Sequence, residues 1–538
     1  MQLAQNYRNP FWLTLAAFVV LKLALHFCTN TNYELHRDTY LYLALADHLD
    51  FGFVSVPPGI AVLAKLSNVL FGESDFAVGI FPALIGAASL LVIGLLVKEF
   101  EGGIWALVLA CSAFVISPAF LRSNTFLQPV SFDQFFWLWS AYFIVKLLKS
   151  QNPIYWLHLS VVSGLAFLTK YAIAFLALAF LIALAFSPQR RLFASKFFGL
   201  GAFVGLVLIL PNLIWQGQHN WPVVQHMREL QETQLVNVAL ADFVLLQFLM
   251  NLPAVFVWIF GLIFLLSRRE QNPYRALGFT FLLVLALLLA LRGKAYYTLG
   301  IYTTLFAAGG VALEKVLVSR FSVLKPLALA AMLALALPVM PYSLPLLPMN
   351  EMLAYAAASQ NFGLSNALRW EDGRIHSLPQ DYADMIGWKE LTVIVSKTYH
   401  SLSAAEQERC VIYAENYGQA GAIRYYGKQF GLPEPVSFHE SFVFWAPAKI
   451  EHDDLILIYV NDELGEDLIQ LFGEITLAGQ LDNVYAREHG VQVYLCKNPQ
   501  AGFAELYNAK VAMLKNRFRS AMSWASCAAK AQPLTGTN

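Results

Sequence analysis

The stretch FAVGIFPALIGAASLLVIGLLV, residues 76–97, contains no charged side chain and is long enough to cross a membrane. A helix of about 20 apolar residues spans the hydrocarbon core of a bilayer. Similar stretches occur on both sides of it, at residues 11–28, 103–121, 131–148, 154–168, 171–187, 197–214, 243–266, 275–291, 296–314 and 326–342. The sequence therefore predicts a polytopic α-helical membrane protein with about eleven transmembrane helices.

Charged residues are unevenly distributed along the chain. Of its 538 residues, 58% are hydrophobic and only 13% are charged, whereas soluble domains contain about 25% charged residues. The deficit falls on residues 1–345, which we predict to form the membrane module. Residues 346–505 are predicted to be a soluble domain, and residues 506–538 an amphipathic helix with a flexible tail. The formal net charge is zero, so nothing indicates a nucleic-acid partner.

Basic residues in short loops predict the orientation, because cytoplasmic loops of membrane proteins are rich in Lys and Arg. Alternate loops contain Lys98, Lys146, Lys149, Arg190, Arg191, Lys196, Arg268, Arg269, Arg275, Lys315, Arg320 and Lys325. The other loops, including 29–75, 215–242 and everything after 343, are expected outside. For a bacterial protein this means the inner membrane, with a periplasmic C-terminal domain.

The segments outside the spans contain short elements of their own. In the first outer loop, 29–75, Tyr40–Leu49 and Ile60–Phe71 have the spacing of amphipathic helices lying on the membrane surface. In the loop 215–242 we expect a polar helix at Gln225–Gln234. The C-terminal domain is predicted to be α/β. Its expected strands are Leu391–Val395, Cys410–Ala414, Leu455–Val460 and Val491–Leu495, and its expected helices are Leu402–Arg409, Ala420–Phe430, Asp462–Leu471 and residues 505–530.

The five cysteines are Cys28, Cys111, Cys410, Cys496 and Cys527. No CxxC pair occurs, so neither a zinc site nor a thioredoxin-like motif is indicated. Cys410 and Cys496 either form a disulfide in an oxidising compartment or are free buried thiols.

Acidic residues at the outer face are the first candidates for catalysis. Glu34, His36, Arg37 and Asp38 follow the first span directly, where charged side chains are costly and tend to be functional. A carboxylate there can act as a general base toward an acceptor hydroxyl. The alternative is a solvated loop with an Arg–Asp pair. Asp133 starts another span, and its alternative role is to cap that helix.

Cations on the same side supply the complementary charge. Arg122, Lys170, Arg292 and Lys294 all belong to the predicted outer face. A leaving phosphate gains negative charge as its bond breaks and needs such partners. The alternative for each is a side chain that extends from the membrane edge to water.

Several stretches resemble glycosyltransferase family 39, the family of dolichyl-phosphate-mannose–protein mannosyltransferases and of the lipid A aminoarabinose transferase. They are HRDTYLY (36–42), HLDFGF (48–53), LFGES (70–74), GLAFLTKY (164–171), GKAYY (293–297), AAGGVALE (307–314), LPQDYADM (378–385) and ENYGQAGA (415–422). The resemblance implies a GT-C fold and an inverting transfer of a hexose or pentose from a polyprenyl-phosphate donor. The acceptor would be a hydroxyl of a lipid, glycan or protein.

The resemblance also implies roles for individual residues. Asp38 matches the catalytic carboxylate of the family, and Asp133 a second acidic position. The donor phosphate is assigned to Arg37, Lys170, Arg292 and Lys294. Glu34, His36, Arg122, Tyr296 and Tyr297 are assigned more broadly to substrate. No metal site is implied, although a divalent cation joining Asp38 and Asp133 stays open.

Two positions depart from the family pattern. Thr39 stands where many relatives have an acid, and Val56 where many have Lys before Pro57-Pro58. These departures keep open a catalytically silent, glycan-lipid-binding relative. A transporter or flippase for lipid-linked sugars is the other alternative. It would place ionisable residues at mid-membrane depth, which the predicted spans largely lack.

Overall fold

The computed structural model describes residues 10–233, 235–267, 272–320, 324–450 and 454–519. They divide into two compact units, each assembled from separate stretches of the chain. The first unit comprises the described residues of Met1–Tyr42, Gly59–Ile209 and Gln231–Asp384. The second comprises those of Leu43–Pro58, Leu210–Leu230 and Met385–Asn538. The division after Asp384 differs from the boundary expected at 345, because residues 346–384 pack with the helical unit.

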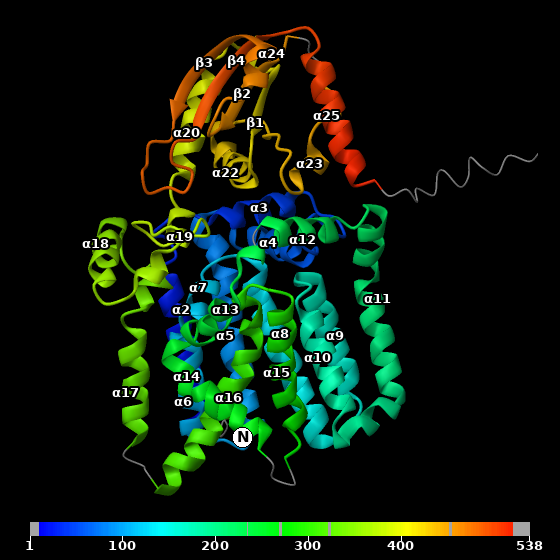
Figure 1. Ribbon diagram of the computed structural model, residues 1–538, viewed down its shortest axis with the longest axis vertical. Helices are drawn as coiled ribbons and strands as arrows, with labels where there is room; N and C mark the ends of the chain where they lie inside the picture. The colour runs from blue at the N-terminus through cyan, green and yellow to red at the C-terminus, as the bar shows by residue number, and fades with distance from the viewer. Residues whose placement is uncertain (1–9, 234, 268–271, 321–323, 451–453, 520–538) are drawn as a thin grey trace, which may run out of the picture. The chain divides into compact units, whose positions relative to one another are not determined.

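Apolar helices build the first unit, and each predicted span falls on helix (Figure 1). They are α2 (Pro10–Phe27), α5 (Asp75–Glu99), α6 (Ile104–Ile116), α8 (Pro129–Ser150), α9 (Tyr155–Thr169), α10 (Ile173–Ala185), α11 (Lys196–Gln218), α13 (Leu240–Leu249), α14 (Val255–Leu266), α15 (Arg275–Ala290), α16 (Leu299–Arg320) and α17 (Leu324–Ala336). The polytopic helical class is thereby confirmed. α11 continues at its C-terminal end into the second unit.

The lengths of these helices differ from the expectation of eleven full spans. Among the described residues, α2, α5 and α11 are each long and apolar enough to cross a membrane. Two bent pairs bring the number to five, and most of the others are apolar helices of 10–17 residues. The predicted span 243–266 is one of the bent pairs, with an angle of 69°. Pro253 follows the bend, where its missing N–H and rigid ring end the preceding helix.

Helix α16 lies at the centre of the first unit and packs against α5, α6, α8 and α14. Small residues let it approach its neighbours closely, as in many membrane helix pairs. A Cβ on Gly309 would lie 1.8 Å from the carbonyl oxygen of Val257 in α14. One on Gly310 would lie 2.3 Å from the carbonyl oxygen of Ala106 in α6. The AAGGVALE stretch therefore lets α16 pack closely against both α14 and α6.

Shorter elements connect the long helices. They are α3 (Arg37–Asp47), α4 (Gly59–Phe71), α7 (Pro118–Ser123), α12 (Pro222–Thr233), α18 (Met349–Gln360), α19 (Gln380–Ala383) and the 3₁₀ turns η1 (Pro188–Ala194), η2 (Leu235–Asn237), η3 (Leu252–Ala254), η4 (Ala295–Thr298), η5 (Met340–Tyr342) and η6 (Ser365–Leu368). The helices predicted in the loops 29–75 and 215–242 are present. However, α3 is not an amphipathic surface helix, because every residue from Tyr40 to Ala46 is buried.

The second unit contains a four-stranded sheet in the order β1-β2-β4-β3 (Figure 1). Its strands are β1 (Cys410–Ala414), β2 (Ile456–Asn461), β3 (Phe472–Gln480) and β4 (Gln492–Pro499). β1 and β2 are parallel, and the other pairs are antiparallel. Its helices are α20 (Trp388–His400), α21 (Ala404–Gln407), α22 (Tyr417–Gly427), α23 (Phe442–Trp445), α24 (Glu466–Leu471) and α25 (Phe503–Arg517), with the turn η7 (Lys428–Phe430). The predicted α/β class is correct, and the part of the predicted helix 505–530 beyond 519 lies outside the described residues.

One predicted strand in this unit was wrong, and one strand was not predicted. Leu391–Val395 is part of α20, whose buried residues Trp388, Leu391, Thr392 and Val395 recur with helical spacing. A short apolar run alone does not distinguish a buried helix from a strand. β3 was not predicted, because it is an edge strand with mostly exposed residues and a Gly-containing sequence.

The sheet also settles the cysteine question. Cys410 lies on β1 and Cys496 on β4, and β2 runs between them. Adjacent strands are about 4.8 Å apart, so two strands of separation exceed the Cα distance that a disulfide spans. Both thiols are free and buried.

Candidate functional site

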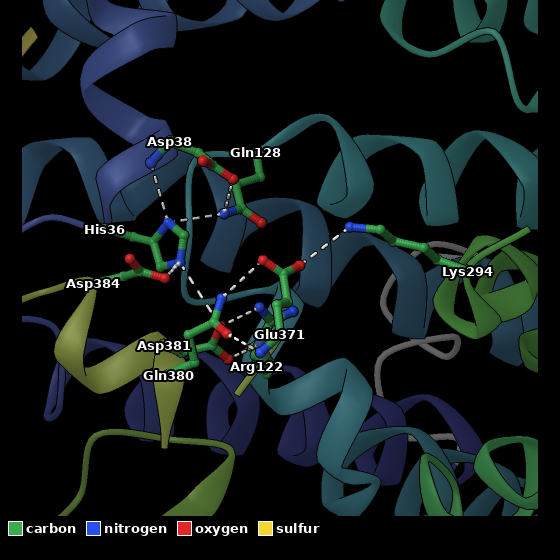
Figure 2. Close-up of polar contacts among 9 residues, drawn as sticks. All are labelled: His36, Asp38, Arg122, Gln128, Lys294, Glu371, Gln380, Asp381 and Asp384. Atoms are coloured by element: carbon green, nitrogen blue, oxygen red, sulfur yellow. Dashed lines mark hydrogen bonds and ion pairs between the residues drawn. The ribbon is translucent and has the colours of Figure 1, made fainter. Parts of the chain in front are cut away.

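Asp38 lies in the first turn of α3, within the first unit, and is half-buried. A negative charge is favoured there because the unpaired N–H groups of a helix N-terminus carry partial positive charge. The carboxylate oxygen Oδ2 of Asp38 accepts a hydrogen bond of 3.3 Å from Nε2 of Gln128 (Figure 2). Gln128 is the N-cap residue of α8. The amide therefore orients the carboxylate from a second helix.

His36 lies between Asp38 and two further acids (Figure 2). Its Nδ1 accepts hydrogen bonds from the backbone N–H of Asp38 at 3.2 Å and from Nε2 of Gln128 at 3.1 Å. Its Nε2 lies 3.8 Å from Oδ1 of Asp381 and 3.8 Å from Oδ2 of Asp384. Burial by itself would lower the pKa of His36, but Asp381, Asp38 and Asp384 together raise it above the ordinary value of 6.5.

Asp381 and Arg122 form a two-pronged ion pair. The guanidinium donates through Nε and Nη2 to the two carboxylate oxygens of Asp381. Burial favours the neutral acid, yet the charge and hydrogen bonds of Arg122 hold the pKa of Asp381 well below its usual range. The same carboxylate keeps the pKa of Arg122 above its usual value against the effect of burial. Arg122 is thus already paired within the protein.

A second cluster surrounds Lys170, which follows the last residue of α9. Its Nζ lies 5.1 Å and 4.8 Å from the ring centroids of Tyr296 and Tyr297. Burial lowers the pKa of Lys170, the charge of Asp133 opposes this effect, and Lys294 adds to it. Lys294 itself pairs with Glu371 at 3.2 Å. The predicted cations Lys170 and Lys294 are therefore brought into the same electrostatic environment.

The two clusters are connected through Tyr296. Tyr296 and Asp38 both contribute to raising the pKa of Arg122, and the ring of Tyr296 also lies 5.1 Å from Nζ of Lys170. Segments far apart in the sequence thus place an acid, an arginine, a tyrosine pair and two lysines in one region of the first unit.

The other residues that the sequence predicted for the site make different contacts. Asp133 is only 3% exposed, and its Oδ1 accepts a 2.9 Å hydrogen bond from Nε1 of Trp137. It does not cap α8, because Gln128 is the N-cap residue. Arg292 is exposed, and its Nη1 donates to the carbonyl of Val236 at 3.4 Å. Glu34 and Arg37 are half-buried, and the backbone N–H of Arg37 donates to the carbonyl of Asp384 at 3.0 Å.

Among the described residues, one group of three side chains could hold a metal ion: His36, Asp381 and Asp384. Neither Asp38 nor Asp133 belongs to it. A metal at Nε2 would require the proton on Nδ1, but Nδ1 accepts the N–H of Asp38. Asp381 is also engaged by Arg122 on both oxygens. The arrangement fits a hydrogen-bond network better than a metal site.

Sequence reasoning missed Gln128, Glu371, Asp381 and Asp384 as candidates. The stretch LPQDYADM contains the two aspartates, but the resemblance assigns no role to them. Because this stretch is far from His36 and Asp38 in the sequence, its contact with them could not be predicted. Gln128 lies in a loop whose sequence has no distinctive pattern.

Comparison with known proteins gives the following relationships. Residues 55–215 match the family model of dolichyl-phosphate-mannose-protein mannosyltransferase. The lipid A galacturonosyltransferase RgtD of Rhizobium johnstonii is 30% identical over 199 residues. That alignment covers 36% of this chain and 41% of RgtD, so the chain spans about two fifths of this curated relative.

Solved structures extend the similarity over most of the fold. ArnT from Cupriavidus metallidurans, bound to undecaprenyl phosphate, matches with a TM-score of 0.61 at 14% identity, over 90% of this chain and 98% of ArnT. The mycobacterial arabinofuranosyltransferase AftD matches with a TM-score of 0.51 at 14% identity, over 90% of this chain and 40% of AftD. The chain is thus similar over part of its length to the dolichyl-phosphate-mannose-protein mannosyltransferase family and to RgtD, and over most of its length it shares the fold of ArnT.

Proposed function

We propose that this protein transfers a sugar from a polyprenyl-phosphate donor to an acceptor hydroxyl, with inversion at the anomeric carbon. The observation that carries the proposal is the half-buried Asp38 at a helix N-terminus, oriented by Gln128 and His36. It belongs to the same unit as the cluster of Lys170, Tyr296, Tyr297 and Lys294. RgtD is a lipid A galacturonosyltransferase and ArnT binds undecaprenyl phosphate in its crystal structure, and both facts support this substrate class.

In the proposed reaction Asp38 acts as the general base. It removes the proton of the acceptor hydroxyl as the oxygen attacks the anomeric carbon. The bond between that carbon and the phosphate oxygen breaks, and the polyprenyl phosphate leaves with the bonding electrons. Lys170 and Lys294 stabilise the negative charge that grows on the phosphate. Arg37 is a further candidate. Arg122 is set aside because Asp381 binds it through both carboxylate oxygens, whereas Lys294 is paired with one oxygen of the exposed Glu371.

The donor sugar is proposed only as a hexose or pentose, and the acceptor as a lipid, glycan or protein. A lipid-borne acceptor is the first to test, because RgtD is named for lipid A. We further propose that the site and the C-terminal domain face the periplasm of a bacterial inner membrane. The support is the distribution of Lys and Arg in alternate loops.

The decisive experiment uses the full-length protein in lipid nanodiscs with a panel of labelled undecaprenyl-phosphate sugars and candidate acceptors. We expect Asp38→Asn to lower kcat by about 100-fold or more, because a general base typically contributes 10²–10⁴-fold. Asp242→Asn, at an exposed acid in the first turn of α13, is the matched control and should be as active as wild type. Undiminished transfer by Asp38→Asn would contradict the mechanism.

A further inference from the structure

We infer that His36 is a positioning residue that holds Asp38 in place only while its imidazole is neutral. This inference rests on the proposed role of Asp38 as the base. The first N–H groups of a helix have no partner within the helix, and side-chain oxygens of Ser, Thr, Asp or Asn usually accept them. At α3 the acceptor is instead Nδ1 of His36, which accepts a hydrogen bond from the backbone N–H of Asp38.

The hydrogen bonds around His36 determine which ring nitrogen carries the proton. Nδ1 accepts from the backbone N–H of Asp38 and from the side-chain N–H of Gln128. Both partners are donors only, so Nδ1 must present its lone pair. The proton of the neutral ring therefore lies on Nε2, which faces the carboxylates of Asp381 and Asp384.

Gln128 links this ring to the catalytic carboxylate. Its amide nitrogen has two hydrogens, and it lies within hydrogen-bond distance of both Nδ1 of His36 and Oδ2 of Asp38. The backbone of Asp38 is thus held by His36 directly, and its carboxylate is held through Gln128. The ring is only 5% exposed and lies 4.8 Å from the ring of Phe126, so water has little room to replace these contacts.

Protonation of His36 would break both links. A doubly protonated ring has no acceptor left, so the backbone N–H of Asp38 and the side-chain N–H of Gln128 would each lose the hydrogen bond to Nδ1. A positive charge at a helix N-terminus is also unfavourable. The charged groups that act on the ring are Asp38 on α3, Asp381 on α19 and Asp384 directly after α19. Arg122 on α7 pairs with Asp381 and neutralises its charge. The enzyme is therefore expected to lose activity on acidification as His36 becomes protonated.

The experiment measures kcat against pH for the wild type and three variants in nanodiscs. The wild type should show an acid limb with a midpoint above about 6.5, the usual range of His. His36→Asn supplies an oxygen that caps the helix but does not titrate, so this limb should disappear. His36→Ala and Gln128→Leu should lower kcat up to about 100-fold while the donor KM changes less than about twofold, since misplacement of a base affects mainly the chemical step. His158→Asn, at an exposed histidine of α9, is the control and should keep the wild-type profile.

Other outcomes would overturn the inference. Persistence of the acid limb in His36→Asn would show that another group controls it. Loss of activity on EDTA treatment, together with loss of a bound divalent ion in His36→Asn, would indicate a metal site instead.

A second readout separates this inference from the proposed function. The ¹⁵N chemical shifts of labelled histidine, assigned with His36→Asn, report which ring nitrogen is protonated without requiring turnover. At alkaline pH we expect the Nε2–H form for His36, and the Nδ1–H form would contradict the inference. If the wild type transferred no sugar but His36 showed the Nε2–H form, the proposed function would fail while the capping role stood.

Discussion

At the scale of single residues, the site depends on which charges the protein itself satisfies. Arg122 appeared in the sequence as a free cation for the donor, but Asp381 binds its guanidinium through both oxygens. A carboxylate held by an arginine is a rigid anchor. Asp381 also faces Nε2 of His36, so it orders the site, and in the proposed reaction Lys170 and Lys294 remain the partners of the donor phosphate.

Asp381→Asn is predicted to destabilise the protein by about 1–2 kcal/mol at neutral pH. This value lies between the contributions of exposed and of buried ion pairs to stability, because the Arg122 side chain is 36% exposed. Since the folded-state pKa of Asp381 is lowered, the stabilisation is present above the ordinary Asp pKa of about 4. It is lost as the pH falls further toward the lowered value.

Thermal unfolding in detergent, followed by Trp fluorescence across this pH range, tests the prediction. The control is Asp372→Asn, which changes an exposed acid of the same segment that pairs with His376. An unchanged thermal midpoint for Asp381→Asn at neutral pH would mean that the ion pair contributes nothing measurable.

At the scale of helices, close approach depends on the absence of side chains on α16. Gly309 and Gly310 face α14 and α6 at distances that exclude a Cβ. Glu314 at the same helix accepts the backbone N–H groups of Gly103, Trp105 and Ala106, and so caps α6. One helix thereby sets the spacing and the termini of its neighbours.

Gly309→Ala is predicted to lower the stability of the protein by about 2 kcal/mol or more. The added methyl group would meet backbone rather than a flexible side chain, which is the most costly kind of overpacking. Gly199→Ala on α11 is the matched control, because a Cβ there meets nothing within 4 Å. Since Ala favours a helix by about 1 kcal/mol over Gly, Gly199→Ala should be neutral or stabilising. Equal thermal midpoints for the two variants would contradict the packing argument.

At the scale of the whole molecule, the units do not follow the order of the chain. Residues 43–58 and 210–230 belong with the C-terminal domain. Within that unit Arg424 pairs with Asp47, the Ser441 hydroxyl accepts the N–H of Val54 at 3.0 Å, and the rings of Trp215 and Phe444 lie 5.9 Å apart. These two loop segments therefore rely on the C-terminal domain for their packing.

Removal of residues 385–538 is predicted to destabilise the protein that remains. Asp47 would lose its partner, and the apolar surface around Trp215 would become exposed, which favours aggregation. Size-exclusion chromatography of the full-length and shortened proteins in the same detergent measures the effect. A shortened protein that is as monodisperse and as thermally stable as the full chain would show that the loops hold their structure alone.

Composition and periodicity were sufficient to predict the membrane class, the positions of the helices and the α/β character of the C-terminal domain. These features depend on local physics, because the bilayer requires long apolar segments whose backbone bonds are satisfied within each helix. The same local signals failed at Leu391–Val395 and β3. A short apolar run and an exposed edge strand have no distinctive pattern of their own.

The sequence by itself also determined that acids and cations gather in the loops that carry Asp38, Lys170 and Lys294. Only the tertiary structure decided their partners. It joined His36 to Asp381 and Asp384, more than 300 residues away in the chain, and it assigned Arg122 to Asp381. It also placed β2 between the strands that carry Cys410 and Cys496, so these cysteines are not paired. The physical reason is that hydrogen bonds and ion pairs act over a few ångströms, and only the folded chain determines which side chains come that close.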